Sequence, residues 1–376
     1  MQSVKRFHAL DSFRGIFSLS VVAFHMHIVG SFSELPLFRN ADLFVEFFFV
    51  LSGFVLAHSY GATEHLNFRK FFISRTCRLL PLHIFMLVIF ILLEYGKLLA
   101  YSNGIEFNNE PFSGENAARE ILPNLLLIQS WSIFTTPLSF NYPSWSISVE
   151  YYVYLIFALI LIYFFRGRKC IWAGIVMISS LLMYFNIDFP TSHALRGLTC
   201  FFSGTLAYAI YKMLETRFTL SSMQLTCLET SSLSATIFAL AQEFMGKSLV
   251  ISLLFCVVII VFAADRGALS KVLRAPFFTL LGKLSYSIYL THAAILFFFL
   301  STFIVLQRIS GRSFTLMISN HRNIDLGNPL LNNVLALFIL ATVVPVSMFT
   351  YKYIEVVGQN FGRRLNKKYS DVGRHN

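Results

Sequence analysis

The stretch that decides the fold class is FFFVLSGFVLAHSYG, residues 47–61. It is an apolar run with few polar side chains, and Asp42 and Glu46 come just before it. About 20 apolar residues are enough for a helix to cross the ~30 Å hydrocarbon core of a bilayer. The stretch therefore predicts a membrane-spanning helix over 42–61. Its small pair, Ser52 and Gly53, favours close packing by another helix, for which the helix that carries His25 is a candidate.

The composition of the whole chain points the same way. Of its 376 residues, 56% are hydrophobic and 13% are charged, whereas soluble domains average about 45–50% apolar and about 25% charged residues. A net charge of +11 is typical of proteins that bind nucleic acid or membranes, and the apolar content favours membrane lipid and no nucleic acid. The five cysteines have no metal-ligand spacing, so we expect no metal site and no disulfide framework.

Ten apolar windows are long enough to span a bilayer. They cover 10–30, 42–61, 80–101, 144–165, 170–187, 195–213, 222–243, 248–264, 277–303 and 331–353. The segment 119–138 is also apolar, but it contains Pro123, Asn124, Gln129 and Pro137. Such residues are tolerated at membrane depth only where protein covers them, so we expect this segment to be re-entrant or to lie at the outer surface.

The distribution of basic residues predicts the orientation, because cytoplasmic loops carry an excess of Lys and Arg. With the N-terminus in the cytoplasm, most of the 30 Lys and Arg residues fall on the cytoplasmic side. The outer stretches hold only Arg39, Arg119, Arg196, Lys247, Arg308, Arg312 and Arg322. The sequence thus predicts an all-α polytopic membrane protein with about ten transmembrane helices and both termini cytoplasmic. We expect one transmembrane domain over 1–360 and a short basic cytoplasmic tail over 361–376.

Several predicted spans carry ionisable residues, which are costly at membrane depth and therefore indicate function by default. Arg14 and His25 are eleven residues apart, which is three helical turns plus about 20° and a rise of about 16 Å. They therefore share one face of a helix, with Asp11 and Ser18 on the same side. The alternatives are that Arg14 reaches back to the cytoplasmic headgroups and that His25 makes an interhelical hydrogen bond.

A second cluster, Arg75 and Arg78, lies one helical turn apart on the predicted cytoplasmic side. The guanidinium fork suits phosphate oxygens, which favours a site for a phosphorylated cofactor. The alternative is a basic loop that sets the topology and contacts anionic lipid.

Two further motifs occur in later spans. In PSWSISVEYYVY, residues 143–154, Ser146 and Glu150 are four residues apart. Trp145 and the tyrosines are typical of an interfacial belt, but a carboxylate so close to hydrocarbon needs a partner.

In LGKLSYSIYLTH, residues 281–292, Ser285, Tyr289 and His292 share one helical face. The alternative reading of this face is hydrogen bonding between helices.

These residue types suit two classes of protein. Buried His, Glu and Arg side chains supply the general base and anion binder of an intramembrane transferase. A proton-coupled transporter or flippase uses the same side chains, although paired halves with matching broken helices are absent from the sequence. A non-catalytic scaffold or lipid-binding protein would not need Arg14, His25 and Glu150 buried together.

Taken together, the motifs resemble those of the acyltransferase 3 family of bacterial integral membrane proteins. LDSFRGIFSLSVVAFH at 10–25 is similar to its Arg-x10-His signature, and FFFVLSGFVL at 47–56 resembles the motif that follows it. SRTCRLLP, PSWSISVEYYVY and LGKLSYSIYLTH resemble the family's Arg-x-x-Arg, Trp-Ser-x-x-x-Glu and Ser-Tyr-x-x-Tyr-Leu-x-His motifs. YKYIE at 351–355 is similar to the terminal motif, without the proline that often follows it.

This resemblance implies ten spans in the bacterial inner membrane. It also implies transfer of an acyl group, usually acetyl from acetyl-CoA, to a carbohydrate hydroxyl of O-antigen lipopolysaccharide or exopolysaccharide at the outer face. His25 would act as general base or as an acetyl carrier. The expected partners are membrane lipid and the carbohydrate acceptor, without a metal; the motifs do not specify the sugar, the acyl group or the oligomeric state. The implied catalytic residues are His25, Arg14 and Glu150, the implied donor-binding residues are Arg75, Arg78 and Arg14, and the implied acceptor-binding residues are Trp145, Ser146, Glu150, Tyr289 and His292.

Overall fold

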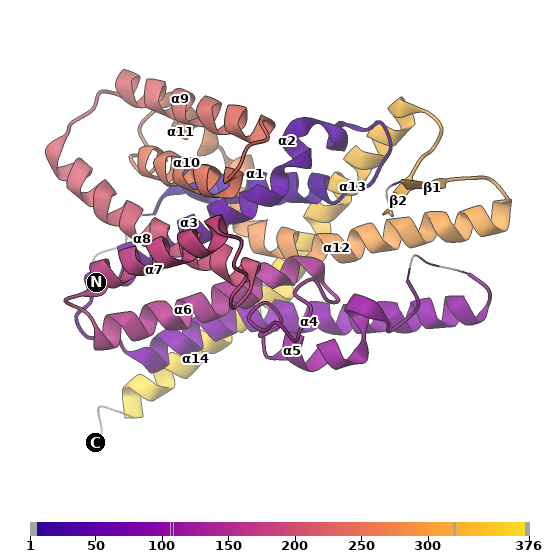
Figure 1. Cartoon of the computed structure of the whole chain (residues 1–376), viewed down its shortest axis with the longest axis horizontal. Coiled ribbons are helices and arrows are strands. Elements are labelled where there is room, and N and C mark those ends of the chain that lie inside the picture. Colours follow the sequence, from indigo (N-terminus) through magenta and orange to yellow (C-terminus); the bar gives the residue numbers. More distant parts are fainter. Residues whose placement is uncertain (1–5, 106, 108, 319–320, 373–376) are drawn as a thin grey trace. The chain divides into compact units, whose positions relative to one another are not determined.

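The computed structural model describes residues 6–105, 107, 109–318 and 321–372, with side chains up to Lys368. The described chain is mainly helical (Figure 1). Its α-helices are α1 His8–Phe24, α2 Pro36–Arg39, α3 Phe44–Tyr60, α4 Phe68–Ser102, α5 Ile121–Leu125, α6 Trp145–Tyr163, α7 Arg168–Tyr184, α8 Ser192–Arg217, α9 Ser222–Ala241, α10 Lys247–Phe262, α11 Ala268–Leu273, α12 Pro276–Ser310, α13 Pro329–Thr350 and α14 Val356–Val372. Two short antiparallel strands, β1 Thr315–Ile318 and β2 His321–Ile324, pair Thr315 with Ile324.

Each of the ten predicted spans contains a helix. Among the described residues, five helices are both long and apolar enough to cross a bilayer. They are Ala41–Tyr60, Phe68–Ser102, Tyr142–Tyr163, Pro276–Ser310 and Pro329–Lys368. An all-α membrane protein is therefore confirmed at this level, and the count of ten spans with both termini in the cytoplasm stays a prediction. Segment 119–138 forms no spanning helix, because α5 has five residues and turns follow it.

The chain forms two compact units. The first unit comprises Met1–Phe17, Asp42–Arg75 and Val149–Ser285, and the second comprises Ser18–Ala41, Thr76–Ser148 and Tyr286–Asn376.

In the first unit, α3 packs closely against α8. A Cβ atom on Gly53 would lie 1.9 Å from the Phe201 carbonyl oxygen, and one on Gly204 would lie 1.9 Å from the Val50 carbonyl oxygen. The two glycines therefore allow the backbones to touch, as small residues do in membrane helix pairs. The predicted close packing at Gly53 is confirmed, but the partner is α8 and not the helix that leads to His25.

A buried carboxylate adds a polar link in the first unit. Glu46 on α3 is fully buried, and its Oε1 lies 3.4 Å from Arg196 Nε on α8. Ser252 on α10 donates a 2.9 Å hydrogen bond to Glu46 Oε2. A charge at such depth needs partners of this kind, so Glu46 joins three helices.

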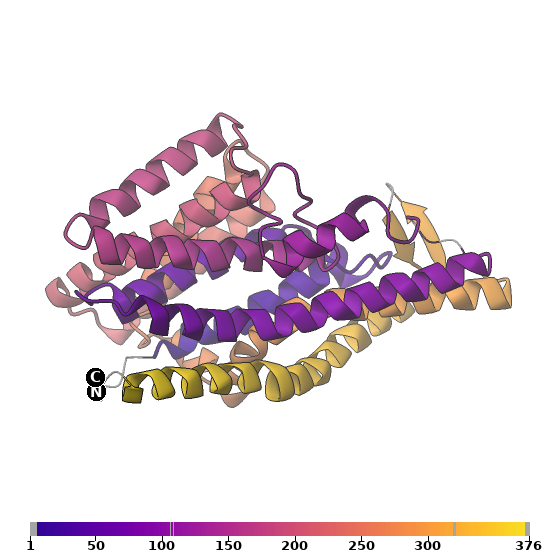
Figure 2. The same ribbon diagram turned by 90° about the horizontal axis from the view of Figure 1, so that it is seen from below.

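In the second unit, α12 makes polar contacts with its neighbours. Tyr286 donates a 2.6 Å hydrogen bond to the Leu79 carbonyl oxygen of α4, and Ser287 donates one of 3.0 Å to Glu355. Glu355 ends a π-helical turn, Tyr351–Glu355, that joins α13 to α14. Figure 2 shows α13 and α14 as one bent rod. Wide turns of this kind and prolines are recognised causes of helix bending, and α13 contains Pro345.

Candidate active site

Two histidines from distant parts of the sequence meet in the second unit. His25 directly follows α1, and its backbone N–H still bonds to the Val21 carbonyl oxygen at 3.2 Å. His292 lies on α12 and is fully buried. His292 Nε2 lies 3.2 Å from His25 Nδ1, and the two rings are stacked with centroids 5.1 Å apart.

The contacts of His25 determine which ring nitrogen can act as a base. His25 Nδ1 lies 3.0 Å from the Val21 carbonyl oxygen. A carbonyl oxygen only accepts, so this hydrogen bond places the proton of neutral His25 on Nδ1. His292 Nε2 then shares the same proton as a second acceptor. Nε2 is consequently the unprotonated nitrogen of neutral His25, and its lone pair can accept a proton in general-base catalysis.

Aromatic and hydroxyl side chains surround the histidine pair. The Tyr142 ring lies 4.6 Å from the His25 ring, and the Tyr289 ring lies 6.0 Å from the His292 ring. The Ser146 hydroxyl, in the first turn of α6, lies 3.0 Å from the Tyr289 hydroxyl. Two sequence motifs, around Ser146 and around Tyr289, thus converge on the pair.

The segment 119–138 and its neighbours hold the start of α6 in place. Ser130 donates a 3.0 Å hydrogen bond to the Trp145 carbonyl oxygen, and Ser148 donates one of 2.6 Å to the Leu127 carbonyl oxygen. Asn141 donates one of 3.1 Å to the Leu290 carbonyl oxygen of α12. The polar residues of this segment therefore satisfy buried groups, and α6 and α12 present their motifs on a fixed base.

A cavity of ≈ 490 Å³ lies in the second unit, and His25 is one of its lining residues. This volume is within the range of about 300–1,000 Å³ that is usual for small-molecule sites. Tyr142 and Trp145 contribute aromatic faces, whereas Glu115 and Asn116 contribute polar groups. Apolar side chains of α4, α12 and α13 form much of the remaining wall.

One buried carboxylate anchors a wall of this cavity. Glu94 on α4 accepts hydrogen bonds from the Phe112 N–H at 2.9 Å and from Asn116 Nδ2 at 2.8 Å. Lys97 Nζ is 3.5 Å from the same carboxylate. Asn116 in turn accepts a 2.8 Å bond from the Phe140 N–H. These bonds fix the loop that follows α4 against the cavity.

Strand β2 contributes to the cavity wall through His321, Arg322 and Ile324. After α1 ends, the chain pairs with β2: the Ile324 N–H bonds to the His27 carbonyl oxygen at 2.8 Å, and the Val29 N–H bonds to the Ile324 carbonyl oxygen at 3.0 Å. The His27 and His321 rings stack at 4.9 Å, and both residues line the cavity.

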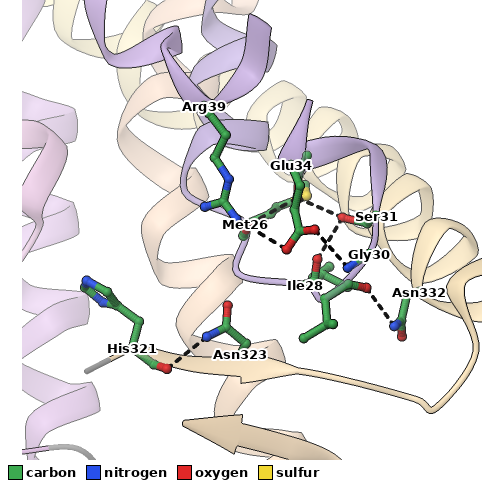
Figure 3. A network of polar contacts seen from close by, with 11 residues as sticks. Met26, Ile28, Gly30, Ser31, Glu34, Arg39, His321, Asn323 and Asn332 are labelled. Atoms are coloured by element: carbon green, nitrogen blue, oxygen red, sulfur yellow. Dashed lines mark hydrogen bonds and ion pairs between the residues drawn. The ribbon is translucent and has the colours of Figure 1, made fainter. Parts of the chain in front are cut away.

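Figure 3 shows the polar network that supports this wall. Glu34 accepts bonds from the Gly30 N–H at 3.2 Å and from Arg39 at 3.3 Å. Asn332, at the start of α13, donates a 2.8 Å bond to the Val29 carbonyl oxygen. The turn after His25 is therefore held at several points.

The remaining predicted site residues lie elsewhere on these elements. Arg14 is half-buried on α1 in the first unit, next to Gly15. A Cβ on Gly15 would lie 2.4 Å from the Leu281 backbone, so α1 touches α12 beside Arg14. Arg78 is half-buried on α4 in the second unit.

Arg75 and Glu150 both belong to the first unit and share a neighbour. Ser52 donates a 2.8 Å hydrogen bond to Glu150, and Tyr154 donates a second one. The Arg75 guanidinium carbon lies 5.6 Å from the centre of the Tyr154 ring. Ser52 therefore binds a carboxylate, in addition to the packing role expected for the pair Ser52 and Gly53.

The sequence interpretation missed Tyr142, Tyr154 and Glu94, and it missed the stacked pair His27 and His321. Tyr142 precedes the Trp-Ser motif by three residues and has no helical spacing to mark it. Tyr154 is four residues after Glu150, and that spacing was available as a signal.

The sequence matches a known protein family. The family model Acyl_transf_3, described as an acyltransferase domain, matches residues 7–352. The chain is similar to acyltransferase MdmB of Streptomyces mycarofaciens, with 31% identity over 202 residues, which are 50% of this chain and 49% of that protein.

Two other relatives match shorter parts. A putative peptidoglycan O-acetyltransferase, YrhL of Bacillus subtilis (strain 168), is 28% identical over 46% of this chain and 27% of its own length. Protein 2 in the picA locus of Rhizobium radiobacter is 40% identical over 23% of this chain and 44% of its own length. The chain thus spans about half or less of the curated relatives it matches. No solved structure matches the chain at a significant level.

Proposed function

The chain belongs to the Acyl_transf_3 family, and from this premise we propose that it is a membrane O-acyltransferase that moves an acetyl group from acetyl-CoA to a carbohydrate hydroxyl. The observation that carries the proposal is His25, whose Nδ1 is hydrogen-bonded to the Val21 carbonyl oxygen and whose ring lines a cavity of ≈ 490 Å³. We place the acceptor in this cavity. The Tyr142 and Trp145 rings suit the apolar face of a sugar, and the polar groups of Glu115 and Asn116 suit its hydroxyls.

In the proposed reaction, His25 Nε2 removes the proton of the acceptor hydroxyl. The oxygen attacks the thioester carbonyl carbon, the carbon–sulfur bond breaks, and the thiolate of CoA takes the proton back from His25. His292 stabilises the intermediate imidazolium, because its Nε2 lies 3.2 Å from His25 Nδ1 and accepts that proton's hydrogen bond. The products are the acetyl ester and free CoA.

For the donor, we assign the phosphates to Arg75, Arg78 and Arg14. The Nε of Arg75 is buried and has no hydrogen-bond partner among the described residues. A guanidinium with unused donors suits phosphate oxygens, which accept hydrogen bonds in pairs. Trp145, Ser146, Tyr289 and His292 are assigned to the acceptor side, where Ser146 and Tyr289 support the ring environment of His292.

We further propose that the acceptor is an O-antigen lipopolysaccharide or exopolysaccharide and that transfer occurs at the outer face of the bacterial inner membrane. A relative named as a putative peptidoglycan O-acetyltransferase supports a surface glycan as the acceptor class. The apolar helices support residence in a membrane.

Radiolabelled acetyl-CoA tests the proposal on the full chain in lipid nanodiscs, offered with a panel of surface glycans. We expect label in glycan esters with the wild type, and a loss of at least about 100-fold with His25→Ala, the usual lower range for a general base. In a parallel assay with the chain in sealed proteoliposomes, label that enters the vesicles without covalent transfer would instead support a transporter. Transfer by His25→Ala at the wild-type rate would refute the assignment of His25.

A further inference from the structure

Glu150 is held in the first unit by two hydroxyl groups. Its Oε1 accepts a 2.8 Å hydrogen bond from Ser52 on α3 and a second hydrogen bond from Tyr154, one turn further along α6. Tyr154 is 2% exposed. Both bonds are made to a carboxylate, which strengthens them relative to bonds between neutral groups. The position of the Tyr154 side chain therefore depends on Glu150.

The Tyr154 ring belongs to a group of three rings around one cation. The Arg75 guanidinium carbon lies 5.5 Å from the Phe71 ring centre, 5.6 Å from that of Tyr154 and 5.8 Å from that of Tyr60. Each distance is within the ~6 Å range of cation–π attraction. The rings come from α3, α4 and α6, so the guanidinium has a position determined by three helices.

We propose that Glu150 is a positioning residue for Arg75 and acts on the donor side of the reaction. Its carboxylate orients the Tyr154 ring, and the ring holds the guanidinium in place. The inference rests on the proposed function in one respect, the assignment of the donor phosphate to Arg75. It revises the expectation that Glu150 contacts the acceptor.

Two physical points favour a positioning role. Glu150 Oε1 accepts hydrogen bonds from two protein hydroxyls, those of Ser52 and Tyr154, so this oxygen already orients side chains of the protein. Tyr154 also links the carboxylate to the guanidinium. Its hydroxyl bonds to Glu150, and its ring faces Arg75. Such a bridge transmits orientation because the phenol is rigid.

Chemical modification of arginine tests the positioning without any substrate. The purified full chain in nanodiscs is treated with phenylglyoxal, and the rate of modification at Arg75 is followed by mass spectrometry. We expect Glu150→Ala to raise this rate about two- to fivefold, the equivalent of one lost cation–π contact. Glu150→Gln keeps an acceptor oxygen for Ser52 and Tyr154, so its rate should stay near that of the wild type.

Tyr152→Phe is the matched control, because it removes a hydroxyl from the same helix outside this group. The rate at Arg78 provides an internal reference in every sample. An unchanged rate at Arg75 in Glu150→Ala, with Arg78 also unchanged, would overturn the proposal. Thermal melting of each variant identifies a general loss of folding. If Glu150→Ala does not fold, the modification rates at Arg75 in Glu150→Gln and Tyr154→Phe are compared instead. We expect a higher rate in Tyr154→Phe, which loses the bond to Glu150, and equal rates would overturn the proposal.

Kinetics then connects the positioning to the donor. We expect Glu150→Ala to raise KM for acetyl-CoA by the same two- to fivefold and to leave KM for the glycan unchanged. Adding Glu150→Ala to Arg75→Ala should raise the donor KM no further, because both act through one group. A raised glycan KM with an unchanged donor KM would overturn the proposal. If the wild type has no turnover with acetyl-CoA, the proposed function fails, and the modification rates still decide the role of Glu150.

Discussion

Replacing His292 by Ala removes one of the two acceptors that face the Nδ1–H of His25, at 3.2 Å. This acceptor matters most when His25 carries the extra proton, because the hydrogen bond is then made to a charged ring. Hydrogen bonds to charged groups contribute about 1.5–3 kcal/mol. At 1.36 kcal/mol for each tenfold change in rate, the expected loss in kcat is about 10- to 150-fold.

The loss should be smaller than that caused by His25→Ala. The Val21 carbonyl oxygen still accepts from His25 Nδ1 at 3.0 Å in the variant, so the tautomer that leaves Nε2 as the base is retained. His292→Gln places an amide oxygen near the former Nε2 and should recover part of the rate. The affinity for the donor should not change.

Initial rates of label transfer in nanodiscs, with both substrates saturating, measure kcat for the wild type, His292→Ala, His292→Gln and His25→Ala. His58→Ala is the matched control, because His58 is a half-buried histidine with its own 3.1 Å contact, to the Tyr208 hydroxyl. A kcat within threefold of the wild type for a folded His292→Ala would refute the reasoning. A loss equal to that of His25→Ala would also refute it, since His292 would then be the base.

Two other predictions concern stability. Gly53→Leu should lower the melting temperature strongly, because its side chain would start 1.9 Å from the Phe201 carbonyl oxygen and overpacking costs about 1–3 kcal/mol or more. Gly174→Leu is the control, because Gly174 has open space around it. Equal melting temperatures for the two variants would contradict the packing described for α3 and α8. His193 lies just before the predicted span 195–213. Burial and the nearby Arg196 lower the pKa of His193 to about 4. The folded state therefore binds this proton less readily than the unfolded state, so stability is intact above pH ~6.5 and falls as the pH drops towards 4. Melting between pH 7 and pH 5 should show this fall, and His193→Gln should weaken it; an unchanged pH dependence in the variant would contradict it.

The apolar windows predicted where helices form, because the length and apolar character of a spanning helix are local properties of the sequence. They did not predict which helices meet. Gly53 signals a close contact, but nothing local distinguishes α8 from α1 as its partner. The strands Thr315–Ile318 and His321–Ile324 lie between two windows, and each is only four residues long, so they give almost no periodic signal.

The candidate site was predictable as a set of residues and not as an arrangement. His25 and His292 each stand out as ionisable groups in apolar surroundings, yet 267 positions separate them, and only the fold brings their rings together. Glu150 was recognised as a carboxylate in need of a partner. Its partner, Ser52, is 98 residues away and looks like an ordinary small residue in a helix interface.

The anchoring of the cavity wall by Glu94 has a consequence for engineering. The loop residues Phe112 and Asn116 are tied to α4 through this one carboxylate, and Lys97 on the same helix donates a 3.3 Å hydrogen bond to the Glu110 carbonyl oxygen. The loop can therefore be exchanged for one of different composition, provided that the residues attached to α4 are kept. With the acceptor placed in this cavity, as proposed, we expect such an exchange to change acceptor preference without altering the positions of His25 and His292.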